Sequence, residues 1–142
     1  PGWTEPDPVA WQARLIELGA RPEWVIDGQY GASLTARLKR ADLAIFLDLP
    51  THVCLWRIVK RWLRLRGQVR PEMAAGCPEK IDLEFIHWVA TFRRFQRPKV
   101  VAALRDSAVR TLAIRTAREQ RAFTDAVAKV GLGAALAGAS PV

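Results

Sequence analysis

The spacing of apolar residues along the chain predicts helices and strands in alternation. Residues 8–19 are predicted to form a helix, because apolar residues recur there at helical spacing, Asp7 can cap the start and Gly19 suits the end. The short apolar run 24–26 that follows is typical of a buried strand. Ser33 can then cap a second helix that ends shortly before the next apolar run.

The central part of the chain has the pattern of a strand followed by a long helix. Leu43 to Leu47 is a continuous apolar run without alternation, which is typical of a strand covered on both faces in a parallel sheet. Thr51 can cap the helix that comes next. That helix is predicted to bury one apolar face, formed by Val53, Trp56, Val59 and Leu63.

Beyond this helix the periodicity stops from residue 67 to residue 80, where prolines and glycines predict a loop. Further elements are expected in the order helix around 85–92, helix from Pro98, strand over 109–114 and helix over 117–130. The Gly/Ala-rich tail 131–142 is expected to be flexible.

Strands that alternate with helices indicate an α/β fold with a doubly wound parallel sheet. Only three strands can be counted, which is few for such a sheet. We expect one domain over residues 1–130, with a lid-like segment at about residues 64–80, followed by the tail.

Composition narrows the class of protein. Half of the 142 residues are hydrophobic and a quarter are charged, as in an ordinary globular domain. No apolar run is long enough to span a membrane, so we expect no membrane partner. Cys54 and Cys77 cannot form a disulfide framework, which favours a reducing, cytoplasmic location. The net charge of +8 calls for a polyanionic partner or a very soluble surface.

Two carboxylates follow predicted strands. In open parallel sheets, ligands bind outside the carboxyl ends of the strands. Asp27 and Asp48 stand at two such ends, where phosphotransferases commonly hold Mg²⁺. The alternative is that each aspartate caps the turn that follows it.

Arginines mark the long central helix. Arg57, Arg61 and Arg64 recur at helical spacing and share one face, and Arg66 and Arg70 extend the series into the loop. The planar guanidinium group can bind two phosphate oxygens at once. Such a charge run is often only a solvated face, but this stretch contains no acidic residue to balance it. The lack of acidic residues weakens the interpretation as a solvated face, and a phosphate ligand is the alternative.

Several short motifs in one order carry a resemblance to a known family. They include Pro1-Gly2-Trp3, Trp24-Val25-Ile26-Asp27-Gly28-Gln29-Tyr30, Leu47-Asp48-Leu49-Pro50, Cys54-Leu55-Trp56-Arg57, Gly76-Cys77-Pro78-Glu79 and Arg115-Thr116-Ala117-Arg118-Glu119. Through them the chain closely resembles the bacterial P-loop NTPases described as adenylate-kinase-like or as DNA topology modulation proteins. The resemblance covers nearly the whole chain apart from the tail.

The resemblance implies a fold of the nucleoside-monophosphate-kinase type that binds ATP and Mg²⁺. Asp27 would be the metal-side aspartate, and Asp48, a second candidate metal ligand, would open the helix that leads to the lid. The residues implied to contact nucleotide phosphates during catalysis are Arg57, Arg61 and Arg70. Further cofactor-binding residues would be Arg64, Arg66 and Arg118, the last of them near the adenine.

The sequence departs from this family in one respect. It contains no G-x-x-x-x-G-K-[ST] phosphate-binding loop and none of the family's opening strand. That strand lies at the centre of the family's sheet, between the strands that would end here at Asp27 and Asp48. We therefore expect a partial sheet that lacks its central first strand, and a chain that is destabilised and catalytically incompetent by itself.

Three functions are compatible with the sequence. The first is phosphate transfer, in the full-length form, from ATP-Mg²⁺ to a small acceptor such as a nucleotide. The second is a basic nucleic-acid-associated protein that uses its arginines without catalysis. The third is a non-catalytic interaction module that retains the fold.

Overall fold

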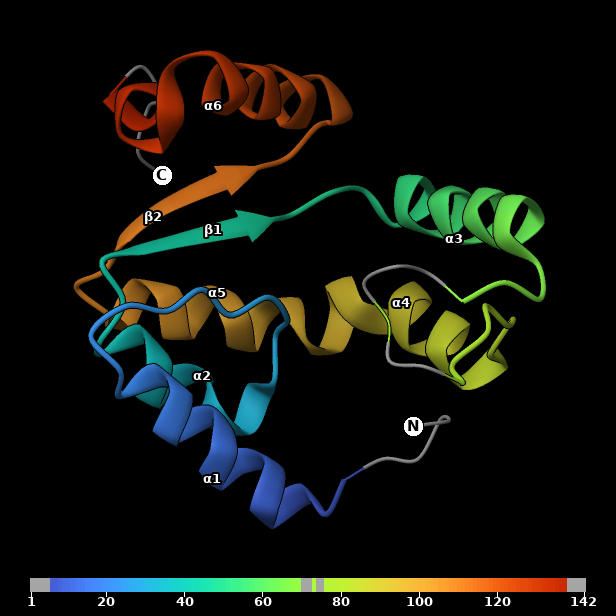
Figure 1. Ribbon diagram of the computed structural model, residues 1–142, viewed down its shortest axis with the longest axis horizontal. Helices are drawn as coiled ribbons and strands as arrows, with labels where there is room; N and C mark the ends of the chain where they lie inside the picture. Colours follow the sequence, from blue (N-terminus) through green and yellow to red (C-terminus); the bar gives the residue numbers. More distant parts are fainter. Residues whose placement is uncertain (1–5, 70–72, 74–75, 138–142) are drawn as a thin grey trace. The chain divides into compact units, whose positions relative to one another are not determined.

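A computed structural model describes residues 6–69, 73 and 76–137 of the chain. This part has a mixed α/β fold of six helices and one two-stranded parallel sheet (Figure 1), which confirms the predicted class at that level. In chain order the elements are α1 (Pro8–Gly19), α2 (Gly31–Leu38), β1 (Leu43–Leu47), α3 (Thr51–Leu65), α4 (Leu83–Phe95), α5 (Arg97–Asp106), β2 (Arg110–Ile114) and α6 (Ala117–Ala137).

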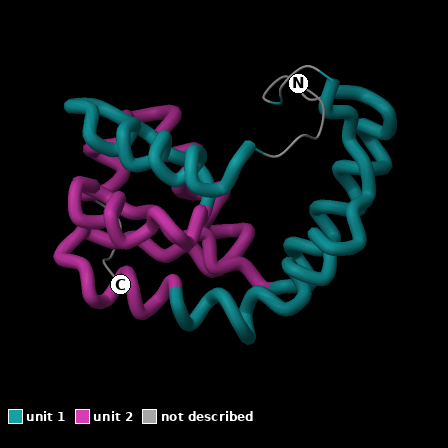
Figure 2. Tube along the Cα trace, turned by 90° about the horizontal axis from the view of Figure 1, so that it is seen from below, with its two compact units in different colours: residues 1–28, 51–99 teal, residues 29–50, 100–142 magenta. Residues whose placement is uncertain are grey.

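The chain divides into two compact units, which Figure 2 shows in different colours. Unit 1 consists of Pro1–Gly28 and Thr51–Lys99, and unit 2 consists of Gln29–Pro50 and Val100–Val142. Helices α1, α3 and α4 therefore belong to unit 1, whereas both strands, α2 and α6 belong to unit 2.

The sheet of unit 2 pairs two of the predicted strands in parallel. Leu43 lies opposite Arg110 and Leu47 lies opposite Ile114. The pairing continues beyond β1, since the Asp48 N–H donates to the carbonyl oxygen of Ile114 at 2.9 Å. Figure 1 draws α6 on one side of the strand pair and α2 on the other. The best-buried apolar side chains of this unit are Leu38, Leu49, Val100, Ile114, Ala135 and Leu136.

One face of β1 is more open than the sequence predicted. Ile45 is 42% exposed and Leu47 is 51% exposed, although a continuous apolar run is typical of a strand covered on both faces. An uninterrupted apolar run shows that both faces could be buried. Whether another element covers each face depends on the rest of the fold.

The predicted strand at 24–26 does not form in the described part of the chain. The segment has no ladder partner, since the sheet contains only β1 and β2, and Val25 is 98% exposed. A three-residue apolar run has the composition of a strand, but a strand is stable only beside another one. The prediction of a buried strand that ends at Asp27 is therefore wrong.

Unit 1 confirms the predicted start of its first helix. The Asp7 carboxylate accepts a hydrogen bond from the Ala10 N–H at 2.8 Å, and Pro8 occupies the first turn. Leu15 is 3% exposed and anchors α1. Helix α4, which packs against α3, begins in the same way, because the Asp82 carboxylate accepts from the Phe85 N–H at 3.1 Å.

Helix α3 forms where it was predicted, but it buries a different face. Of the four residues expected to be buried, Val53 is half-buried, whereas Trp56 is 63% exposed, Leu63 is 62% exposed and Val59 is 36% exposed. The half-buried apolar residues of the helix include Leu55, Ile58, Trp62 and Leu65. Both sets recur at helical spacing, and the pattern alone could not choose between them.

The start of α2 also differs from the prediction. Tyr30 occupies the cap position in a left-handed conformation (φ 37°), whereas Ser33 lies inside the first turn and is 0% exposed. The Ser33 hydroxyl donates to the Tyr30 carbonyl oxygen at 3.1 Å and accepts from Arg37 Nε at 3.1 Å. Ser33 therefore stabilises the first turn through the hydrogen bonds of its hydroxyl group and does not cap the helix.

Helix α6 continues past its predicted end at residue 130. Gly131, with φ 80° and ψ 165°, interrupts the helical geometry, and helical structure resumes as far as Ala137. The guanidinium of Arg110 donates to the Leu136 carbonyl oxygen at 2.6 Å, which ties the end of α6 to β2. This contact and the burial of Leu136 explain why helical structure extends beyond the glycine.

Candidate anion-binding site

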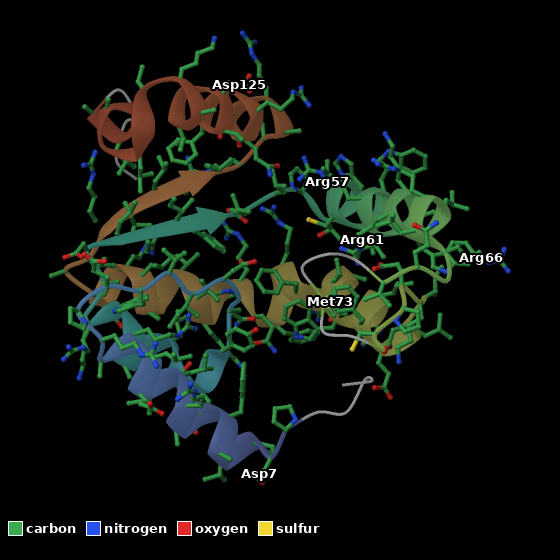
Figure 3. The ribbon with its side chains drawn as sticks, viewed as in Figure 1. Asp7, Arg57, Arg61, Arg66, Met73 and Asp125 are labelled. Carbon is green, nitrogen blue, oxygen red and sulfur yellow. The ribbon has the colours of Figure 1, made fainter. Side chains whose placement is uncertain are left out.

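A basic hollow lies along one face of α3. Its volume is about 320 Å³, and its lining consists of Arg57, Lys60, Arg61, Arg64 and Leu65. These positions are three or four residues apart, so successive turns of one helix bring the cations together. Figure 3 shows Arg57 and Arg61 on this helix. The structure thus brings together three of the predicted arginines and adds a lysine.

Arg61 has an anionic partner. Arg61 Nε donates to Glu79 Oε1 at 2.7 Å, and the Glu79 side chain is only 4% exposed. The Glu79 N–H donates to the Gln68 carbonyl oxygen at 2.9 Å, which fixes the segment after α3 beside the end of the helix. The ion pair neutralises part of the charge of the hollow and fixes the orientation of Arg61.

Arg66, which was predicted to extend the arginine series, lies outside the lining of the hollow. Its guanidinium carbon stands 5.2 Å from the centroid of the Trp62 ring, a cation–π arrangement. Arg70, a predicted catalytic residue, lies outside the described residues. Two of the five predicted arginines therefore gain no support from the geometry of the hollow.

The two predicted metal carboxylates lie in different units. Asp27, in unit 1, is exposed and follows a segment that forms no strand, so the strand-end argument for it is lost. Asp48, in unit 2, is 6% exposed and follows β1 directly, as predicted. Within the described part of the chain, no group of three His, Cys, Asp or Glu side chains could hold a metal ion. A Mg²⁺ ion would therefore need phosphate or water ligands in addition to Asp48.

Arg118, the predicted adenine-side residue, is exposed in the first turn of α6. The start of this helix is fixed by its neighbours: the Arg115 N–H donates to Glu119 Oε2 at 2.8 Å, and the Glu119 N–H donates to Thr116 Oγ1 at 3.1 Å. The hydrogen bond from the Arg115 N–H to its carboxylate, followed by those from the Thr116 hydroxyl and N–H, lowers the pKa of Glu119 from its ordinary value. These hydrogen bonds explain why α6 begins here, and they give no evidence of a nucleotide contact.

Sequence reasoning missed two residues of the site. Lys60 could have been found, because it stands three residues after Arg57 and four before Arg64 on the same helix. Glu79 could not have been found by helical spacing, because it lies 18 residues after Arg61 and meets it only in the folded chain.

Comparison of the chain with models of known protein families, with curated protein sequences and with solved structures finds no match. In the part of the chain that the structure describes, no helix is long and apolar enough to cross a membrane.

Proposed function

We propose that this chain carries the phosphate-binding face of a kinase-like phosphotransferase, in which α3 contacts the phosphates of ATP. The observation that carries the proposal is the hollow on α3, which four cationic side chains line. Guanidinium groups bind phosphate oxygens in pairs, and an ammonium group adds a compact charge. The volume of the hollow, about 320 Å³, lies at the lower end of the range of small-molecule sites.

The fold of unit 2 supports the same proposal. Two parallel strands joined through intervening helices are the repeating element of doubly wound α/β proteins. We propose that this pair is part of a sheet of the nucleoside-monophosphate-kinase type, and that the central first strand of that sheet is missing from this chain. Asp48 is buried directly after β1, at the strand end where such sheets bind their ligands.

Phosphoryl transfer depends mainly on positioning and charge neutralisation, and these are the roles proposed for the basic residues. Arg57, Lys60 and Arg64 would bind phosphate oxygens, while Glu79 holds Arg61 in orientation. Within unit 2, Asp48 is the carboxylate proposed for Mg²⁺, which would neutralise phosphate charge when bound. The 142 residues contain no G-x-x-x-x-G-K-[ST] loop, so we assign binding to this chain and transfer to a form that has the loop.

Calorimetric titration of the chain with ATP tests the proposal. The triple variant R57Q/K60Q/R64Q removes three cations of the hollow and is expected to weaken ATP binding at least about tenfold, because charge-assisted contacts are lost. The matched control, R105Q/R121Q/K129Q, removes three exposed cations of unit 2 and is expected to change the affinity by about two-fold or less. Equal losses in both variants would refute a specific site on α3.

The acceptor of the phosphate would be a nucleotide or another small molecule. A second function, binding of nucleic acid without catalysis, is favoured by the net charge of +8. The affinity for random duplex DNA would then fall steeply and linearly on a log–log plot against salt. Saturable binding of ATP that duplex DNA does not displace would favour the kinase-like function.

A further inference from the structure

Beside its basic hollow, α3 exposes an apolar stripe that the described residues leave in solvent. Trp56 is 63% exposed, Leu63 is 62% exposed and Val59 is 36% exposed. These residues recur at three- and four-residue spacing and therefore share one side of the helix. A large aromatic side chain in water forgoes the stabilisation that burial gives, so its exposure beside a charged site suggests a ligand.

Trp56 is not one of the residues that line the basic hollow, but helical geometry places it next to them along α3. It precedes Arg57 directly and stands one turn before Lys60, with which it shares a face. At a rise of about 1.5 Å per residue, the Cα atoms from Trp56 to Arg64 cover about 12 Å along the axis. An elongated ligand along α3 would therefore meet an aromatic ring first and then successive cations.

We propose that Trp56 is the platform for the base of a nucleotide whose phosphates lie in the hollow of Arg57, Lys60, Arg61 and Arg64. This inference rests on the proposed function and names its ligand class as a nucleoside polyphosphate, in contrast to an inorganic phosphate chain. The indole ring offers a flat π surface to any base. The cationic side chains beside it would bind phosphate oxygens.

The dimensions of the site favour a single nucleotide over a nucleic-acid strand. The hollow of about 320 Å³ lies at the lower end of the volume range of small-molecule sites and is partly open to solvent. Proteins that bind single strands place several aromatic side chains along a basic groove, one for each stacked base. Helix α3 presents one strongly exposed aromatic ring beside its cations, since Trp62 lies half-buried and stacks with Arg66.

The test compares the affinities of the chain for ATP and for inorganic tripolyphosphate, measured by calorimetry in the same buffer. The wild-type chain is expected to bind ATP about five- to 150-fold more tightly, the range that one stacked base contributes. Trp56→Leu is expected to abolish this preference and to leave the tripolyphosphate affinity unchanged. Trp56→Phe is expected to retain part of it. The matched control, Trp11→Leu, removes a tryptophan that is 37% exposed on α1 and is expected to keep the full preference.

The unchanged tripolyphosphate affinity of Trp56→Leu also shows that the variant is folded. Equal affinities of the wild-type chain for the two ligands would refute the platform and leave phosphate binding on α3 intact. Binding of neither ligand would refute the proposed function itself. A single-stranded oligonucleotide that binds more tightly than ATP and depends on Trp56 would also overturn the assignment, in favour of a strand.

Discussion

Arg37 is a buried cation of unit 2, and its replacement by methionine tests what holds the start of α2 together. The residue is 6% exposed. Its Nε donates to Ser33 Oγ at 3.1 Å, and its Nη2 donates to the carbonyl oxygens of Gln29 and Tyr30. Its guanidinium carbon also lies 5.8 Å from the centroid of the Tyr30 ring. One side chain thus holds together the backbone turn in which Tyr30 has a positive φ.

The expected loss in the free energy of unfolding follows from the hydrogen-bond acceptors that lose their donor in the Arg37→Met variant. The Tyr30 carbonyl oxygen keeps the Ser33 N–H at 2.9 Å, so the main losses fall on the Gln29 carbonyl oxygen and Ser33 Oγ. Each buried acceptor that loses its partner costs about 1–3 kcal/mol. Burial, which lowers the pKa of Arg37, also penalises the cation, and the variant recovers that desolvation. We expect a net loss of about 2–4 kcal/mol in the free energy of unfolding.

The assay is equilibrium urea denaturation followed by far-ultraviolet circular dichroism. Lys39→Met, an exposed change at the end of the same helix, is the matched control and is expected to shift the free energy of unfolding by about 0.5 kcal/mol or less. Arg37→Lys, which keeps the charge but has fewer fixed donors, is expected to fall between the two. An Arg37→Met variant as stable as the Lys39→Met control would refute the reasoning.

Two further predictions concern the hydrogen-bonded carboxylates of Glu79 and Glu119. Glu79→Gln is expected to lower the free energy of unfolding by about 1–3 kcal/mol, because Arg61 then faces a neutral amide in place of the buried carboxylate that it contacts at 2.7 Å. Urea denaturation measures this change, and an unchanged midpoint would contradict it. The pKa of Glu119 is lowered in the folded chain by the Arg115 N–H, so its contribution to stability is complete above the unfolded pKa and is lost as pH falls through the lower folded pKa. Thr116→Ala is expected to raise the pKa of Glu119 towards its ordinary value in an NMR titration of the carboxyl group; no change would contradict the role of the Thr116 hydroxyl.

Local signals in the sequence determined most of the helices and the two strands that form. Asp7 caps α1 because its carboxylate reaches an N–H within one turn, and this requires no distant residue. The apolar runs at 43–47 and 109–114 became β1 and β2, which pair in parallel as the alternation with helices predicted. The arginine face of α3 was visible for the same reason, since helical spacing alone places its residues together.

The burial of each face was decided only by tertiary structure. Helix α3 has two apolar stripes, and its sequence could not show that Leu55 and Ile58 would be half-buried while Trp56 and Leu63 remained in solvent. The segment at 24–26 has the composition of a strand, but strand hydrogen bonds need a partner strand that no local pattern can supply. The distribution of charge within the hollow depends on the same kind of contact, because Glu79 reaches Arg61 from a distant part of the chain.

The sequence by itself determined which segments are helical or extended and where the cations of α3 gather, because those properties depend on interactions within a few residues. Only the folded chain decided that Trp56 stands exposed beside the cations and that Glu79 neutralises Arg61. The physical reason is that burial and ion pairing depend on which distant groups meet, and each such contact must offset the entropy of ordering the chain that makes it.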